Sequence, residues 1–195
     1  MYLNRYLFYT NYQKQRSAME KPTKILSDEH VLILKIADAL NNECDAIENG
    51  KIIDGAFFEK AVDFIRNYAD KFHHAKEEDI LFKELCKEGV LTHCNPVEQM
   101  LYEHDTGRGF VKNMEKAVRE SNKSKIIENA RNYANLIKEH IFKEDNILYP
   151  MADQSLDKNK QKSVLDKFKD AENKRFAKGT KKKYIVIAEE FEKRK

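Results

Sequence analysis

The stretch HHAKEEDILF at residues 73–82 decides how this sequence folds, because it recurs as HIFKEDNILY at residues 140–149. Five of the ten aligned positions are identical, and three others differ only conservatively. Each copy begins with a histidine and has a glutamate four residues later. On an α-helix, residues four apart lie one above the other. Each copy therefore predicts a helix that presents an imidazole and a carboxylate on the same face.

The pattern of apolar residues around the two copies predicts four long amphipathic helices, since apolar side chains recur at spacings of three and four. The expected helices run from Lys24 to Gly50, from an N-cap at Asp54 to Gly89, from Asn95-Pro96 to the polar break at 121–124, and from Ile126 to Pro150. The short connections between them favour an antiparallel up-down-up-down four-helix bundle over residues 24–153.

The ends of the chain lie outside this predicted bundle. Residues 1–23 are interpreted as an N-terminal extension, and residues 154–195 as a C-terminal helical extension. Two helices are expected in the latter, near 158–172 and 181–194, and we expect them to pack on one end of the bundle. With only 6 glycines, 3 prolines and 35% charged residues, the composition favours an all-α fold over a β-sandwich or barrel.

Composition also limits the class of function. The formal net charge is only +3, so no nucleic-acid-binding surface is indicated. No apolar run reaches about 18 residues and no secretory signal is visible, so no membrane association is expected. Three cysteines without a C-x-x-C motif argue against a disulfide framework and fit the reducing cytoplasm. We expect a cytoplasmic monomer or dimer.

Four of the six histidines fall one to each predicted helix, on the inward-facing stripe. They are His30, His73, His104 and His140. Counting from the predicted turns places the first two at one level and the last two at one level, although the loop at 90–95 must then absorb about 10 Å. Glu29-His30 and Glu103-His104 are a second, shorter repeat, so the chain is interpreted as a duplicated helical hairpin.

Burying so many ionisable groups without a cation would be very unfavourable, so the layer predicts a metal site. Imidazoles and carboxylates without thiolates suit iron, manganese or zinc, and a pair of shared carboxylates suits two ions. The predicted ligands are His30, His73, Glu77, His104, His140 and Glu144.

Two alternative registers remain open. His74 with Glu78 is also an i, i+4 pair, one residue further round the helix, and Asp145 could replace Glu144. The internal repeat favours the first choice in both cases, which would leave His74 and Asp145 beside the site or on the surface.

Three further residues stand close to the predicted layer. Tyr102 and Tyr133 could flank it, although packing is the favoured role for both. Gly107 lies one turn after His104 and could leave room for a diatomic molecule, although packing would also explain a glycine there.

Together these motifs resemble the hemerythrin-like, or HHE cation-binding, family over about residues 25–155. The resemblance rests on ILSDEH (25–30), FHHAKEEDILF (72–82), MLYEHDTGR (100–108) and HIFKEDNILYPMAD (140–153). It implies an antiparallel four-helix bundle that holds two non-haem iron ions with an oxo or hydroxo bridge. In that family pattern the four histidines would be terminal ligands, and Glu77 and Glu144 would bridge the irons.

The sequence departs from the oxygen-carrying members at one point. Those proteins have two histidines four residues apart on the third helix, whereas the residues four away from His104 are Met100 and Arg108. Neither suits ferric iron, so an open position on both irons is expected. This favours a protein that binds and reacts with dioxygen, peroxide or nitric oxide in oxidative or nitrosative stress, as a possible peroxidase or oxidant reductase. A non-enzymatic sensor or a reversible oxygen-binding protein is the alternative.

Overall fold

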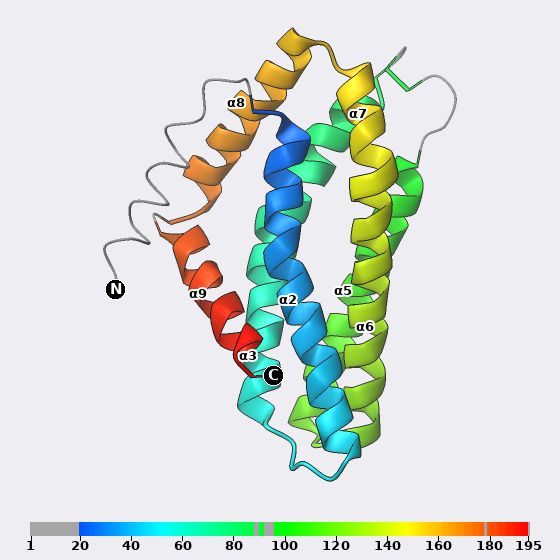
Figure 1. The fold of residues 1–195 in the computed structure, drawn as a ribbon, viewed down its shortest axis with the longest axis vertical. Coiled ribbons are helices and arrows are strands. Elements are labelled where there is room, and N and C mark those ends of the chain that lie inside the picture. The colour runs from blue at the N-terminus through cyan, green and yellow to red at the C-terminus, as the bar shows by residue number, and fades with distance from the viewer. Residues whose placement is uncertain (1–19, 88–89, 92–95, 178, 195) are drawn as a thin grey trace.

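The computed structural model describes residues 20–194 except 88–89, 92–95 and 178, and all regular elements within these ranges are helices (Figure 1). The elements are α2 (Pro22–Glu48), α3 (Gly55–Phe64), η1 (Ile65–His74), η2 (Glu77–Leu81), α4 (Phe82–Leu85), α5 (Val97–Arg119), α6 (Lys123–Lys143), η3 (Glu144–Leu148), α7 (Tyr149–Ser155), α8 (Lys158–Arg175) and α9 (Thr180–Glu192). The three η elements are π-helical and continue the α-helices beside them without a break. The predicted all-α class is confirmed.

Most helix boundaries follow from capping. Pro22 occupies the first turn of α2, where its missing N–H is not needed. Asp54 accepts a hydrogen bond from the backbone N–H of Phe57 at 3.2 Å and begins α3. Asn122 caps α6 in the same way.

Two predicted helix ends need comment. The prediction that Pro150 ends the fourth helix is wrong, because the chain stays helical to Ser155. Pro150 lies in the first turn of α7, directly after the π-helical η3, where a helix tolerates proline. The second helix ends at Leu85, earlier than expected. Its predicted end at Gly89, the Asn95 start signal and residues 1–18 lie outside the described residues.

The four long helical stretches enclose a common interior. α6 packs against both α2 and α5, α3 packs against α5, and η1 packs against α2 (Figure 1). The side chains that meet inside are mostly those of the predicted stripes, such as Leu26, Ile33, Leu40 and Met114.

The apolar core consists of two parts with a polar layer between them. The larger part contains Ile33 to Ile47 of α2 with its neighbours on α3, α5 and α6, and it extends to α9. The smaller part contains Leu26, Leu81 and Leu148, and it extends to α8. The predicted ligands fall in the interval between these parts on α2, on α5 and along η1 and η2, whereas on α6 Ile141 of the larger part follows His140.

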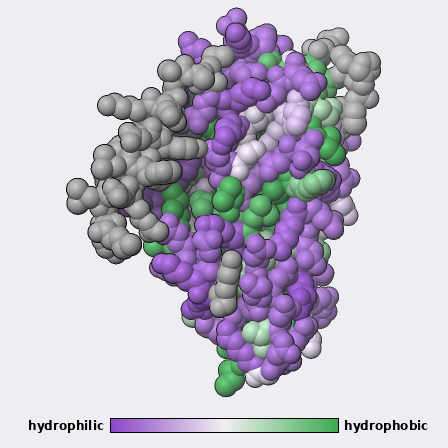
Figure 2. All heavy atoms as spheres, viewed as in Figure 1, coloured by the Kyte–Doolittle hydropathy of each residue, from purple (hydrophilic) through white to green (hydrophobic). Residues whose placement is uncertain are grey.

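The two C-terminal helices lie along the side of the molecule rather than on one end, which corrects the expected position. α9 packs on α2 and buries Tyr184, Ile187, Ala188 and Phe191, while α8 packs on η2 and α2 (Figure 1). The apolar stripe of α9 also contacts α3, where Phe191 lies on Phe57 and Tyr184 on Phe64. On the face shown in Figure 2, hydrophobic side chains gather in a band at mid-height within a largely hydrophilic surface. Among the described residues, no helix has the length and apolarity that crossing a bilayer requires.

Candidate metal centre

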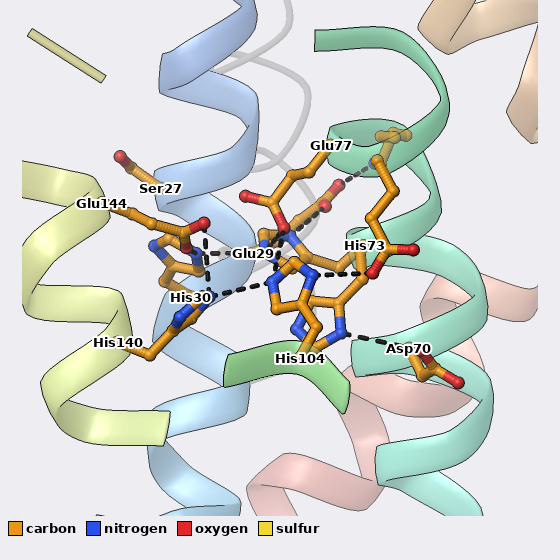
Figure 3. Close-up of polar contacts among 12 residues, drawn as sticks. Ser27, Glu29, His30, Asp70, His73, Glu77, His104, His140 and Glu144 are labelled. Carbon is orange, nitrogen blue, oxygen red and sulfur yellow. Dashed lines mark hydrogen bonds and ion pairs between the residues drawn. The ribbon is translucent and has the colours of Figure 1, made fainter. Parts of the chain in front are cut away.

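The six predicted ligands lie in one buried layer at the centre of the molecule (Figure 3). They are His30 on α2, His73 on η1, Glu77 on η2, His104 on α5, His140 on α6 and Glu144 on η3. Each of them is at most 1% exposed. The structure therefore brings together all six residues from four stretches far apart in the sequence.

The four histidines form two pairs. The Nε2 atoms of His30 and His73 are 3.0 Å apart, and those of His104 and His140 are 2.9 Å apart. Two ligand atoms that lie about 2.1 Å from one ion, at right angles to each other, are about 3.0 Å apart. Each pair therefore has the spacing of two neighbouring ligands of a single ion.

The two glutamates lie between the pairs. Oε2 of Glu77 is 3.4 Å from Nε2 of His73 and 3.6 Å from Nε2 of His104. The two oxygens of Glu144 lie 3.2 and 3.3 Å from the Nε2 atoms of the remaining histidine in each pair. Each carboxylate thus contacts both pairs, as a carboxylate shared by two ions must.

A second set of carboxylates holds the outer nitrogen of every imidazole. The Nδ1 contacts are His30 with Asp145 at 3.0 Å, His73 with Glu29 at 3.1 Å, His104 with Glu78 at 2.7 Å and His140 with Glu103 at 2.8 Å. An imidazole that donates its Nδ1–H to a carboxylate has a lone pair on Nε2, which is the tautomer that binds metal. All four lone pairs therefore face the interior of the layer.

These contacts bear on both open registers. Asp145 and Glu78 lie behind His30 and His104, on the side away from the other imidazole of each pair. Glu144 and Glu77 occupy the space between the pairs. The positions favour the register that the internal repeat indicates.

Two lysines at equivalent positions of the repeat extend this network. Lys76 Nζ lies 2.5 Å from Glu29, and Lys143 forms an ion pair with Glu103. The surroundings of the two lysines differ, because Lys76 is only 2% exposed and also contacts Glu172 on α8 at 2.9 Å, whereas Lys143 is 34% exposed.

Of the two positions that the sequence leaves open for His74, beside the site or on the surface, the structure shows the first. His74 is buried, its ring stacks on that of His104 with 3.8 Å between centroids, and neither of its nitrogens has a hydrogen-bond partner among the described residues. His74, His104 and His140 form a group whose nitrogens lie close enough for one ion. A third imidazole therefore comes from the second helix, although Met100 and Arg108 exclude one from the third.

Tyr149 is a second polar group that the sequence did not single out. Its buried hydroxyl donates a hydrogen bond to Oε1 of Glu77 and lies 3.3 Å from Nε2 of His30, on which its ring stacks. The repeat contains a signal for this hydroxyl, because Tyr149 stands where the first copy has Phe82. Of the two tyrosines predicted to flank the layer, Tyr102 is 67% exposed, so that prediction is wrong for it, whereas Tyr133 is buried.

Many of the residues in and beside the site lie in the π-helical segments. His73 and His74 lie in η1, Glu77 and Glu78 in η2, and Glu144 begins η3. The π-helix bonds i to i+5 and so places an extra residue in each turn, and it is concentrated at functional sites. The second residue of each pair still points in a different direction from the first, so His74 stacks on the His104 ring and Glu78 contacts the outer nitrogen of His104.

Electrostatics show how the layer behaves without a cation. Burial opposes protonation of His30, but Asp145 and Glu144 outweigh it and raise its pKa to about 10. Burial is likewise outweighed at His140, whose pKa rises to about 9 because of Glu144 and Glu103. Burial lowers the pKa of the other buried imidazoles.

The two shared glutamates diverge in the same environment. Burial and the charge of Glu144 raise the pKa of Glu77, whereas His140 and His30 overcome burial and lower the pKa of Glu144. The layer thus cannot hold both carboxylates ionised and all imidazoles neutral unless cations supply the missing positive charge.

The residues present fit a pair of metal ions. Oε2 of Glu77, both oxygens of Glu144 and both nitrogens of His74 are buried without a hydrogen-bond partner among the described residues, and native proteins rarely leave such atoms unsatisfied. The donors divide into two groups, His30 with His73, Glu77 and Glu144, and His74 with His104 and His140. Imidazole and carboxylate donors suit iron, manganese or zinc.

Comparison with known proteins agrees with this site. The sequence model of the family described as "Hemerythrin HHE cation binding domain" matches residues 21–152, which include every ligand candidate. The searches of curated proteins and of solved structures found no match. A match over two thirds of the chain shows that this protein belongs to the hemerythrin HHE cation-binding family.

Proposed function

We propose that this chain is a non-haem di-iron protein that binds small oxidants, namely dioxygen, peroxide or nitric oxide, and reacts with them. The iron pair, joined by an oxo or hydroxo bridge, would supply the electrons for their reduction. The observation that carries the proposal is the convergence of four Nε2 atoms on two shared carboxylates, with every Nδ1 held from behind. The antiparallel four-helix bundle would be the frame that holds these donors at one level.

The ligand assignment makes the two iron sites unequal. His30 and His73 would hold one iron and His104 with His140 the other, while Glu77 and Glu144 are shared. The third imidazole of His74 would fill the second iron's coordination shell. One open position then remains, on the side of His30, instead of the two expected from the sequence.

Tyr149 favours reaction over simple storage. Reduction of dioxygen or peroxide consumes protons, and the Tyr149 hydroxyl lies beside the imidazole of His30 and holds a proton on Glu77. A proton at that oxygen can be passed on to a small oxidant as it is reduced. The same residue excludes water from that side, because its ring covers His30. We extend the proposal to the handling of oxidative or nitrosative stress in the cytoplasm.

One observation favours a second function. A third imidazole from His74 would take the place of the second third-helix histidine of the oxygen-carrying members, so His74 supports reversible oxygen binding or sensing as the alternative.

A kinetic experiment separates the two functions. The protein is loaded with ferrous iron under anaerobic conditions, and about two irons per chain are expected. Stopped-flow mixing with dioxygen, peroxide and nitric oxide then follows the near-ultraviolet absorption of the oxidised centre. Net oxidation supports the proposal. A stable oxygenated form that returns to the diferrous spectrum under vacuum would establish the alternative, and binding of one zinc without any iron spectrum would remove both.

A further inference from the structure

A cavity of about 400 Å³ opens between η1, α5 and α6 and leads to the histidine layer. Its inner end is formed by His74, His104 and His140, and its outer end by surface residues such as Arg66 and Arg119. It therefore reaches the side of the site that has three imidazoles, opposite Tyr149.

The size of this cavity exceeds what the oxidants need. A water molecule occupies about 30 Å³ in the liquid, and a diatomic molecule is of similar size. Cavities that bind organic molecules have volumes of roughly 300–1,000 Å³. The cavity beside the histidines falls in that range.

A glycine keeps the cavity open. A methyl group at Gly107 would lie 3.7 Å from the Tyr133 ring and 3.8 Å from Leu136, so any larger side chain would extend into the space between α5 and α6. The walls there are apolar, from Ile65, Val111 and Ile137. This part of the cavity favours a hydrocarbon body over a hydrated ion.

Two of the arginines that line the cavity are bound to carboxylates. Arg108 donates to Asp70 at 2.8 Å and to Glu78 at 2.5 Å, and Arg66 forms a two-pronged ion pair with Glu115 at 2.8 Å. Their charges are thus largely neutralised within the protein. A charged ligand would gain little from them and would lose its hydration.

Apart from His74, which belongs to the histidine layer, the Tyr133 hydroxyl is a buried polar group in the wall without a partner among the described residues. Tyr133 is only 3% exposed. Buried hydroxyls in native proteins nearly always have a partner. The hydroxyl therefore marks where an oxygen of a bound molecule would lie.

We propose that this cavity is a binding site for a small uncharged organic molecule, with a ring-sized apolar body and one hydroxyl or carbonyl oxygen that hydrogen-bonds to Tyr133. Such a molecule would lie in contact with His74, at the inner end of the cavity. The inference goes beyond the proposed reaction with oxidants and does not depend on which metal the site holds.

The test uses 4-fluorophenol as the probe and the full-length protein loaded with zinc, so that ¹⁹F spectra are free of paramagnetic broadening. Saturable binding of 4-fluorophenol is expected, with little or no binding of 4-fluorobenzoate, which is charged at neutral pH. Gly107→Leu should weaken binding at least tenfold by filling the cavity. Gly109→Leu is the matched control on the same helix, because its added side chain would point into open space.

A second variant removes a single atom. Tyr133→Phe should weaken 4-fluorophenol binding roughly fivefold to tenfold, as expected for one hydrogen bond. Circular dichroism and metal content verify that each variant is folded and loaded. If Gly107→Leu fails this check, the Tyr133→Phe result decides.

Three outcomes would overturn the proposal: absence of saturable 4-fluorophenol binding, unchanged binding by Tyr133→Phe, or benzoate binding as tight as phenol binding. The last result would point to an anion site at the mouth. None of them affects the iron count or the oxidation of the ferrous protein, so this inference and the proposed function can fail separately.

Discussion

The two halves of the histidine layer have the same framework and different surroundings. In both halves a histidine pair is held by carboxylates on Nδ1, a glutamate is shared, and a lysine contacts the outer carboxylate. The half with His30 is closed by Tyr149 and the C-terminal helices, whereas the half with His104 has a third imidazole and the cavity. Duplication thus accounts for the donors, and the later differences account for which side a ligand can reach.

Two positions of the ten-residue repeat contain this asymmetry. His74 in the first copy aligns with Ile141 in the second, and Phe82 aligns with Tyr149. Phe82 lies near His104, with ring centroids 6.0 Å apart, just as Tyr149 lies on His30 at 5.5 Å. Substitutions that interchange these residues can therefore make the halves alike, one feature at a time.

The largest effect is expected at the carboxylates that both halves share. Glu77→Ala and Glu144→Ala should each lose most of the metal, because each removes a ligand that contacts both histidine pairs. Glu78→Ala and Asp145→Ala should keep two metals per chain at saturation, with affinity lowered about 10–100-fold, as is usual when the partner of a ligating histidine is removed. Metal analysis after desalting measures all four.

The controls are built into this set, since each pair consists of adjacent residues. If Asp145→Ala empties the site while Glu144→Ala stays loaded, the assignment of the fourth-helix ligand is wrong. The two copies of the repeat would then not supply equivalent ligands.

The two lysines test the difference in burial directly. Lys76→Met should destabilise the protein by about 3–5 kcal/mol, because it removes the nearest cation from the buried carboxylate of Glu29. That carboxylate keeps His73 and, at 3.5 Å, Lys181 as partners. Lys143→Met removes a partly exposed partner of Glu103, and its effect should be about 0–1 kcal/mol. For a chain of this size the first value corresponds to a fall of roughly 6–20 °C in melting temperature. Calorimetry on both variants, loaded with the same metal, gives the comparison, and equal losses would contradict the asymmetry.

Much of this organisation was predictable from sequence, for physical reasons. The 3.6-residue periodicity and the Asp54 cap indicated the helices, and ionisable residues at inward positions indicated the six ligand candidates. Ionisable side chains are tolerated on a buried helix face only where an opposite charge compensates them, so their presence there indicated a metal site.

The remaining features depend on tertiary structure. His74 was not assigned as a ligand because consecutive residues on an α-helix diverge by about 100°, and its position depends on α5, whose His104 ring stacks on it. From sequence alone Lys76 would be taken for an exposed lysine, because its burial depends on α8, which contacts it through Glu172. An amphipathic stripe shows that a helix packs against other elements but does not show which ones. For this reason α8 and α9 were expected on one end of the bundle, whereas they pack along its side.

The third prediction removes the extra imidazole. His74→Ile restores the residue found in the other copy and should leave two metals per chain, with the one at His104 and His140 released to a chelator roughly tenfold faster or more. Biphasic release kinetics would show that the halves differ. Ile141→Val is the control, because it alters the equivalent position without a ligand. Release at the wild-type rate from His74→Ile would mean that the imidazole only packs on His104.

The smallest structural effect is expected at Tyr149. Tyr149→Phe restores the residue of the first copy and removes only the hydroxyl that contacts Glu77 and His30. In the loaded protein the metals satisfy Glu77, so metal content should be unchanged and stability should fall by only about 0.5–1.5 kcal/mol. If the hydroxyl delivers a proton during reduction, oxidation of the ferrous protein by peroxide should nevertheless slow by about 10²-fold or more. Stopped-flow absorption measures this, and Tyr102→Phe, which removes an exposed hydroxyl, is the matched control. An unchanged rate would show that the closed half excludes water but supplies no proton, and the difference between the halves would then be one of access alone.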